Sequence, residues 1–433
     1  MSEPLRIRWT GALATLTPAD RDALCRRAAA ADPRVRERVA AIVARVRERG
    51  DAALRELARE LDHVELAAIE VPRGRCAAAL ATLDPALRAA LERAARNIDA
   101  FHRAGAPAAF ECETEPGVRV GRRPDPLGAV GVYAPGGRAA YPSTVLMCAI
   151  PARAAGVDRV VLCSPPGPDG LPPPAVLAAA ELAGVDHVFA IGGAGAIAAM
   201  AFGTESVPRV DRIVGPGNAW VMEAKLQVTG ACSIDSPAGP SELLVIADAT
   251  ADPDTIAREV FAQAEHDPAA CVVVLAPAPN AAAVSEAIGG RLRAEPRRAI
   301  IGEALAQNGA VLAVDSLDEA LAFAADYAPE HLLLALADPA AALPRVRNAG
   351  TVFCGASSSV AFGDYATGAN HTLPTGGLAR SYSGLSTLDF VRWTTWQRVT
   401  SDAAAALAAD VARIARAEGL PAHAAAAAAW GRS

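Results

Sequence analysis

Short, uninterrupted apolar runs that alternate with helical stretches dominate the chain from residue 128 onward. One array begins with GAVGVYAP (128–135), and a second begins with LLVIAD (243–248) and continues to TVFCG (351–355). Strands that are apolar at successive residues are typical of a parallel sheet that helices cover on both faces. The pattern therefore predicts an α/β protein with two Rossmann-like parallel-sheet units in tandem.

The segments that flank these arrays have the spacing of helices. Residues 35–62 (VRERVAAIVARVRERGDAALRELARELD) repeat apolar side chains at helical period, and the tail from residue 400 is Ala-rich. Residues 363–386 form a long loop rich in Gly and Ser, and a loop of that length is usually functional or disordered. We expect a helical N-terminal region and a C-terminal helical tail.

Composition excludes several classes of protein. Among 433 residues, 52% are hydrophobic, which is enough for a large core, and no stretch has the roughly 20 apolar residues of a membrane span. The net charge is −7 without a basic block, so no nucleic-acid partner is expected. The eight cysteines form no CxxC pair, and MSEPLRIRWTG lacks an apolar signal core. Reduced thiols and a cytoplasmic location are expected. Schiff-base chemistry would depend on the single lysine, Lys225.

Four of the seven histidines lie beside other polar groups in the second half of the chain. The clusters are Gln263 with His266, Glu330 with His331, Asp364 with His371, and Glu418 with His423. The remaining three, His63, His102 and His187, lie in ordinary helix or strand surroundings, where a surface or core role is expected. Four polar clusters that converge on one α/β unit and the segments after it indicate a site.

Gln263 and His266 are three residues apart near the end of a helical segment that Pro268 terminates. This spacing puts both side chains on one helix face, where they can reach one metal ion or ligand. The alternative is an ordinary helix C-terminus at which both side chains satisfy free carbonyl groups. A metalloprotease is not indicated, because HExxH is absent and Ala262 occupies the position that an HxxEH motif needs.

Glu330 and His331 lie where a helical pattern passes into a strand, so their side chains diverge. One can activate water while the imidazole, which titrates near neutral pH, moves a proton. The alternative is an exposed polar pair at a turn after Pro329. Asp364 and His371 offer ligands that suit a divalent ion such as zinc.

Glycine-containing turns follow several predicted strands of the first array. Gly193-x-Gly195-x-x-Ala198, with Asp211 further on, is similar to a dinucleotide-binding fingerprint, although a single short match is weak. The turns at 133–143 and 214–220 also follow strands, and open parallel sheets bind ligands at these carboxyl ends. Several such turns together favour a cofactor crevice.

Taken together, the motifs resemble the histidinol dehydrogenase family. The matching segments run from RERGDAAL (47–54) to AEGLPAH (417–423), and they include GVYAPGG, STVLM, GPGNAWV, PAGPSELLVIAD, QAEHDP, YAPEHL, GDYATGANHTLPTGGLAR and LDF. The resemblance implies two sequential NAD-dependent oxidations, from L-histidinol through L-histidinaldehyde to L-histidine, the last steps of histidine biosynthesis. It also implies one zinc ion per subunit, which positions the substrate, and a homodimer with shared active sites.

The resemblance assigns a role to each cluster. The implied zinc ligands are Gln263, His266, Asp364 and His423. The implied acid–base pair is Glu330 and His331, with His331 taking protons and Glu330 activating water. Substrate contacts fall on the zinc ligands and on Ser241, His331, His371 and Glu418, while Tyr133 and Asn218 match positions that bind NAD.

The resemblance also implies that one α/β unit is inserted in the other. The expected division is an N-terminal arm (1–24), a main domain (25–130 with 241–384), an inserted NAD-binding domain (131–240) and a tail (385–433) that contacts the partner subunit. One position departs from the family, because Gly195 stands where Gln is usual. The apparent fingerprint is a by-product of that change, and we expect weaker NAD binding through the loss of one hydrogen bond.

Three alternatives remain beside this interpretation. A related dehydrogenase would act on another small polar alcohol, but the complete zinc set, with Glu418 and His423 present, disfavours this alternative. A zinc hydrolase would use Glu330 to activate water, but the chain lacks hydrolase spacing. A non-catalytic, metal-stabilised dimer would have no use for the pair Glu330–His331.

Overall fold

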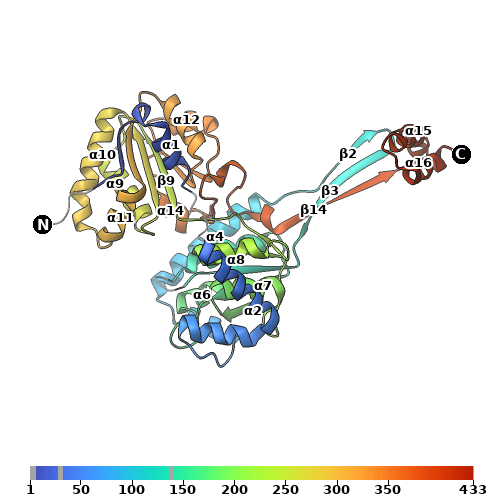
Figure 1. The fold of residues 1–433 in the computed structure, drawn as a ribbon, viewed down its shortest axis with the longest axis horizontal. Helices are drawn as coiled ribbons and strands as arrows, with labels where there is room; N and C mark the ends of the chain where they lie inside the picture. Colours follow the sequence, from blue (N-terminus) through green and yellow to red (C-terminus); the bar gives the residue numbers. More distant parts are fainter. Residues whose placement is uncertain (1–5, 28–32, 137–139, 433) are drawn as a thin grey trace.

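The structure is a computed structural model that describes residues 6–27, 33–136 and 140–432. It is an α/β protein with two parallel sheets and one long antiparallel arm, as the apolar strand pattern predicts for the two sheets. Figure 1 shows the two α/β units beside each other, and the arm leads from them to the C-terminal helices. Parts of all four expected domains, at residues 1–5, 28–32, 137–139 and 433, lie outside the described residues.

The first unit contains a six-stranded sheet in the order β1-β11-β10-β9-β12-β13, and all its neighbouring strands are parallel. Its strands are β1 (Trp9–Ala12), β9 (Glu242–Ala247), β10 (Cys271–Ala276), β11 (Gly309–Ala313), β12 (His331–Ala335) and β13 (Thr351–Cys354). Its helices are α1 (Pro18–Cys25), α9 (Pro253–Ala264), α10 (Ala278–Arg291), α11 (Arg298–Asn308), α12 (Leu317–Tyr327), α13 (Pro339–Ala342) and α14 (Val360–Tyr365).

Helices cover both faces of this sheet. Alternate residues of β9, such as Leu243 and Val245, pack with α9, α10 and α11. The residues between them, such as Leu244 and Ile246, pack with α1 and α12. Because both faces are covered, every residue of the central strands is apolar except at the strand ends.

The second unit contains a five-stranded parallel sheet in the order β6-β5-β4-β7-β8. Its strands are β4 (Ala129–Tyr133), β5 (Arg159–Ser164), β6 (His187–Ala190), β7 (Arg212–Val214) and β8 (Ser233–Ile234). The helices between them are α5 (Pro142–Ala154), α6 (Pro174–Leu182), α7 (Gly193–Phe202) and α8 (Ala219–Val228). Three N-terminal helices, α2 (Pro33–Leu57), α3 (Arg73–Thr82) and α4 (Pro85–Ala104), join the same core, and a π-helical segment, Ala58–Asp62, follows α2.

The observed division corrects the expected domain boundaries. Helices α2–α4 were expected to pack with residues 241–384, but α2 packs on α7 and α8, α3 on α6, and α4 on α5. The expected N-terminal arm instead supplies β1, which pairs with β11 at the edge of the first sheet. The inserted unit therefore contains α2–α4 in addition to the segment from β4 to β8, and is larger than the expected range 131–240. The physical reason is that α1, α12 and α9–α11 already cover both faces of the first sheet.

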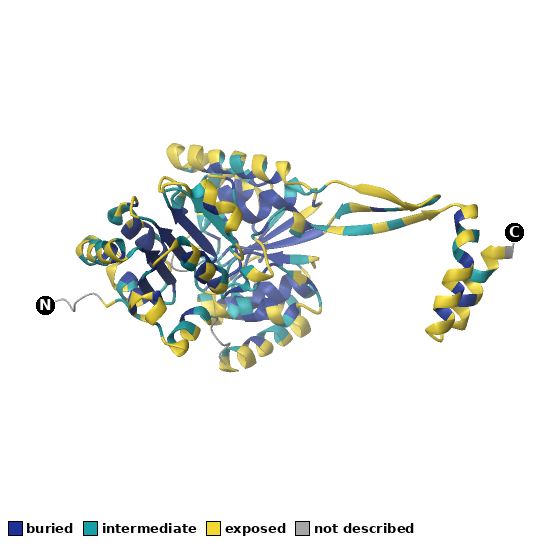
Figure 2. Cartoon of the chain, turned by 90° about the horizontal axis from the view of Figure 1, so that it is seen from above, coloured by how far each residue is buried: buried dark blue, intermediate teal, exposed yellow. Residues whose placement is uncertain are grey.

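The arm is a three-stranded antiparallel sheet in the order β14-β3-β2. Strands β2 (Phe110–Glu115), β3 (Val118–Pro126) and β14 (Val391–Val399) lead to α15 (Ser401–Ala417) and α16 (Pro421–Ala428). Figure 2 shows that the arm is largely exposed and that its helices lie far from both units. These helices bury only a small core of alanines against each other, Ala412, Ala415 and Ala424.

Short helical turns complete the chain. They are η1 (Leu13–Thr15), η3 (Leu292–Ala294), η4 (Leu343–Arg345), η5 (Leu378–Arg380), η6 (Thr387–Phe390) and η7 (Ala429–Arg432). Within residues 6–27, 33–136 and 140–432, none of the helices has the length and apolar character to cross a membrane.

Candidate active site

The predicted acid–base pair lies at the amino end of β12. Helix α12 ends in Ala328, which has a left-handed conformation (φ 50°), and Pro329 prevents the helix from continuing. Glu330 then precedes β12 and His331 begins it. Because β12 pairs in parallel with β9, with His331 opposite Leu243, the amino ends of both strands lie together. Glu330 and His331 are buried, with 6% and 4% of their surfaces exposed.

The backbone of Glu242 fixes both side chains of the pair. Its N–H donates to Oε2 of Glu330 at 2.7 Å, and its carbonyl oxygen accepts from Nδ1 of His331 at 2.9 Å. A carbonyl only accepts, so Nδ1 of His331 carries the proton. Nε2 of His331 is buried without a hydrogen-bond partner among the described residues. It is therefore the atom that can accept a proton from a bound molecule.

Asp364, at the end of α14, lies next to this free nitrogen, with Oδ1 3.6 Å from Nε2 of His331. Burial alone would lower the pKa of His331, but the carboxylates of Glu330 and Asp364 outweigh it and hold that pKa well above its usual range. Burial raises the pKa of Asp364, but the adjacent His331 imidazole dominates and lowers it. A cation bound to Asp364 would neutralise one of the two carboxylates that favour the protonated form of His331. The Asp364 carboxylate therefore fits the role of a metal ligand.

His371 connects the two units. Its Nδ1 donates to the carbonyl oxygen of Asp364 at 2.9 Å, and its Nε2 lies 3.4 Å from Oγ1 of Thr144 on α5. Burial lowers the pKa of His371, which favours the neutral ring. The structure therefore brings Glu330, His331, Asp364 and His371 together where the second unit meets the first.

Gln263 and His266 lie at the end of α9. Gln263 is buried, with 2% of its surface exposed, whereas His266 is exposed. His266 lines a pocket of about 450 Å³ whose wall also includes Leu91 of α4, Met147 of α5 and Tyr365. Helices α9 and α14 contact each other, so the helix ends that carry Gln263, His266 and Asp364 belong to neighbouring elements.

Glu418 and His423 do not join this group. Both are exposed at the end of the arm, in the segment that connects α15 to α16 and in α16 itself. Across the described ranges, no three His, Cys, Asp or Glu side chains gather in an arrangement that could hold a metal ion. The donor types suit zinc, but one chain brings together only part of the predicted ligand set.

Tyr133 and Asn218 lie at the carboxyl ends of the adjacent strands β4 and β7. The order β6-β5-β4-β7-β8 reverses direction between β4 and β7, and such a switch point is where open parallel sheets bind ligands. The hydroxyl of Tyr133 accepts from the Gly193 N–H at 3.1 Å, and burial raises its pKa to about 12. Asn218 caps α8 by accepting from the Trp220 N–H at 3.1 Å.

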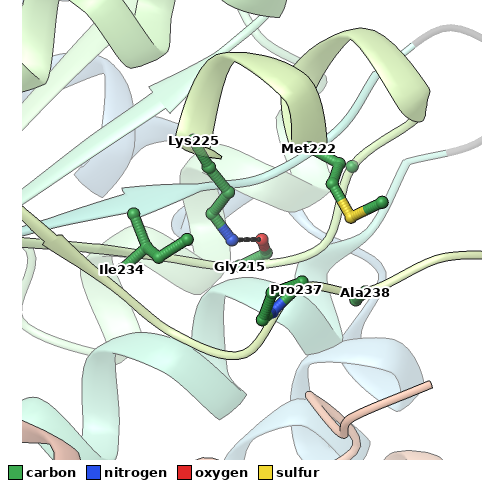
Figure 3. Close-up of a pocket in the computed structure, with 7 residues that line it drawn as sticks. Gly215, Met222, Lys225, Ile234, Pro237 and Ala238 are labelled. Atoms are coloured by element: carbon green, nitrogen blue, oxygen red, sulfur yellow. Dashed lines mark hydrogen bonds between the residues drawn. The ribbon is translucent and has the colours of Figure 1, made fainter. Parts of the chain in front are cut away.

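Lys225, the single lysine of the chain, stabilises the turn that precedes Asn218. Lys225 donates to the Gly215 carbonyl oxygen at 2.7 Å (Figure 3). It also forms a buried ion pair with Asp235, which accepts from the Gly215 N–H at 2.8 Å. Gly215 has φ 116°, and a Cβ there would lie 2.2 Å from the Tyr133 carbonyl oxygen. Lys225 therefore has a structural role that fixes the turn against β4, as its paired and buried ammonium group indicates.

Gly195, the position that departs from the family pattern, lies on the side of α7 that faces α2. A Cβ at this position would lie 3.0 Å from Cδ1 of Leu57 and 3.6 Å from Cδ2 of Leu54. The missing side chain therefore permits close packing of α2 on α7.

Sequence reasoning missed Glu242, Arg27 and Thr144 as neighbours of the site. Glu242 is buried with 1% of its surface exposed, and its side chain pairs with Arg27. A charged residue at the start of an otherwise apolar strand was the one signal for Glu242. Arg27 and Thr144 gave no such signal, because contacts between distant segments bring them to the site.

Comparison with known proteins identifies the family of the chain. The family model of histidinol dehydrogenase matches residues 25–430. The chain belongs to the histidinol dehydrogenase family. A histidinol dehydrogenase from Natronomonas pharaonis is 50% identical over 415 residues, which cover 95% of this chain and 97% of that protein. One from Methanothermobacter thermautotrophicus is 48% identical over 387 residues, 89% of this chain and 91% of that protein.

A solved structure of the family extends the agreement to the whole fold. The crystal structure of histidinol dehydrogenase from Elizabethkingia anophelis has a TM-score of 0.94 and 35% sequence identity, and the match covers 99% of each chain. The arm and the C-terminal helices therefore fall within the shared histidinol dehydrogenase architecture.

Proposed function

We propose that the chain catalyses two successive NAD-dependent oxidations, from L-histidinol through L-histidinaldehyde to L-histidine. Membership of the histidinol dehydrogenase family supports the substrate. The observation that carries the chemistry is the arrangement of His331, whose Nδ1 is held by the Glu242 carbonyl while Nε2 has no partner among the described residues. A cation bound to Asp364 would offset one of the carboxylates that raise the pKa of His331, and the neutral ring can then take a proton from a substrate hydroxyl at Nε2.

The two members of the pair have separate tasks in this proposal. In the first oxidation Nε2 of His331 takes the hydroxyl proton as the C–H hydride leaves. Glu330 then removes a proton from the water that adds to the aldehyde while His331 returns its proton to the aldehyde oxygen, and the neutral His331 takes a hydroxyl proton of the resulting hydrate. Tyr133 and Asn218 would hold NAD at the β4–β7 switch point, where NAD would supply the hydride acceptor for each oxidation. Keeping both oxidations in one closed site protects the reactive aldehyde.

We propose that Gln263, His266, Asp364 and a His423 hold one zinc ion. Three of these donors lie at the ends of α9 and α14, and Asp364 among them lies beside His331. A zinc ion there would bind the imidazole and amino groups of histidinol and would neutralise the Asp364 carboxylate. Ser241 directly precedes β9, and His371 donates to the Asp364 carbonyl oxygen. We propose that both residues contact the substrate, together with Glu418.

The exposed arm supports a homodimer with shared active sites. Helix α15 and the turn η7 leave large apolar side chains in solvent, with Ile414 and Trp430 each 61% exposed. Exposed apolar surface of this kind is typical of a partner interface. We infer that the arm of one subunit reaches the partner and delivers Glu418 and His423 next to its His266 and Asp364.

We also infer a reducing compartment such as the cytoplasm. All eight cysteines are free, and five of them are buried. Burial raises the pKa of these five thiols, for example that of Cys148 to about 12, which keeps them protonated and unreactive.

Metal content of purified variants tests the zinc assignment independently of activity. We expect about one zinc per subunit in the wild type, and loss of most of it in Asp364→Asn and His423→Asn. Glu265→Gln is the matched control, because Glu265 is next to His266 but is not a proposed ligand. Full zinc content in folded His423→Asn would contradict the shared site, and full content in Asp364→Asn would contradict the ligand set.

A further inference from the structure

A buried ion pair lies directly behind the proposed acid–base pair. Nη2 of Arg27 lies 2.5 Å from Oε2 of Glu242, and the two side chains are only 4% and 2% exposed. Neither carboxylate oxygen of Glu242 faces solvent, because Oε1 accepts from the Gly376 N–H at 2.6 Å and Oε2 from the Glu330 N–H at 3.3 Å. The side chain of Glu242 thus holds the backbone of Glu330, while its backbone holds both members of the pair.

The guanidinium of Arg27 reaches the turn that leads into the pair. Nη1 donates to the Tyr327 carbonyl oxygen at 2.8 Å and Nη2 to the Ala328 carbonyl oxygen at 3.1 Å. The group also lies over the Tyr327 ring, with its carbon 3.5 Å from the ring centroid. Ala328 is the left-handed residue (φ 50°) that directs the chain from α12 into Glu330. A non-glycine residue keeps this conformation only where its surroundings impose it.

We propose that Arg27 is a positioning residue that holds Glu330 and His331 in their reactive arrangement through the turn at Ala328 and the carboxylate of Glu242. The inference rests on the proposed function, because it concerns the same pair. Arg27 lies more than 300 residues before the pair, on the segment after α1, so the N-terminal segment contributes directly to the site. A planar guanidinium can serve two carbonyl oxygens and one carboxylate at once, which a lysine ammonium at the same position cannot do with the same geometry.

The alternative is that Arg27 and Glu242 only fill and stabilise the core. The two possibilities differ in what happens when both charges are removed together. Arg27→Met with Glu242→Gln leaves no unpaired buried charge, so this double variant is expected to fold. If the pair only stabilises the core, its turnover stays at the wild-type value. If the pair positions Glu330 and His331, turnover falls although the protein is folded.

The experiment compares wild type, Arg27→Lys, Arg27→Gln and the double variant, each loaded with zinc, in steady-state oxidation of L-histidinol. We expect kcat to fall by about tenfold to a hundredfold in each variant, because a misplacement of about 1 Å can cost that much, while KM changes by less than about threefold. The control is Arg26→Gln, and its kcat should not change, because the Arg26 side chain is 81% exposed and pairs with Asp22. Unfolding curves and zinc content establish that each variant is intact.

The outcomes separate this inference from the proposed function. A wild type that does not oxidise L-histidinol overturns the proposed function and this inference with it. An active wild type with unchanged kcat in the folded double variant overturns the inference alone, and so does a loss confined to KM. Should Arg27→Gln fail to fold, the double variant and Arg27→Lys still decide the question.

Discussion

The acid stability of the inserted unit offers a test of how His102 is buried. His102, on α4, has 1% of its surface exposed, and its Nε2 has no hydrogen-bond partner within the described part of the chain. Burial lowers its pKa to about 4, although Asp99 partly opposes the shift. Because the folded-state pKa is lower than the unfolded value of about 6.5, the buried neutral ring contributes fully to the free energy of unfolding above pH 6.5. This contribution is lost as the pH falls from 6.5 towards 4.

The magnitude follows from the two pKa values. Between pH 7.5 and pH 5, protonation of the unfolded chain at this residue should cost the folded state about 2 kcal/mol. His102→Leu removes the titrating group, so the variant should gain about 2 kcal/mol relative to wild type over the same interval. Urea unfolding at both pH values measures the difference. Ile98→Val, one turn earlier on α4, is the control, because a core change without a titrating group should shift the free energy of unfolding equally at both pH values.

The reasoning fails if the difference in unfolding free energy between His102→Leu and wild type is the same at pH 7.5 and pH 5. That result would mean that the ring is solvated or finds a partner in the folded protein. A change of similar size in Ile98→Val would show instead that the whole unit, and not His102, responds to pH.

Three further predictions concern the site. Glu330→Gln should slow aldehyde hydration by about 10²–10⁴-fold, so the yield should approach one NADH per histidinol with aldehyde released; an unchanged yield in single-turnover assays would exclude Glu330 as the base for water. His331→Asn and His423→Asn subunits, each inactive alone, should recover about a quarter of wild-type activity when mixed and allowed to exchange, because each hybrid dimer has one intact site; no recovery in proven hybrids would contradict shared sites. Gly195→Gln with Leu57→Ala, which makes room beside α7, should bind NAD about twofold to tenfold more tightly than Leu57→Ala alone, measured by calorimetry; equal affinities would mean that Gly195 costs no NAD contact.

The sequence predicted those parts of the fold in which burial imposes a pattern. The central strands β9 and β10 are apolar at nearly every residue because helices cover both faces, and this was visible without a structure. Strand β1 was missed because only Trp9 of its four residues is buried. Strand β2, FECETE, was missed because all six residues are exposed, so that burial imposes no apolar pattern on the strand that pairs with β3.

The site was predictable where its residues are adjacent in the sequence. Gln263 and His266 share one helix end, and Glu330 and His331 share one strand end, so local spacing indicated both pairs. Arg27 and Thr144 were not predictable, because each reaches the site through contacts between distant segments. The separation of His423 from His266 also has no local signal, since it depends on where the arm of β2, β3 and β14 points.

The yield of NADH per L-histidinol, before and after chelation and zinc addition, tests the central claim most directly. We predict about two NADH per histidinol, loss of activity on chelation and recovery with zinc, because one site performs both oxidations and zinc positions the substrate. One NADH per histidinol, or full activity in the chelated protein, would contradict this account.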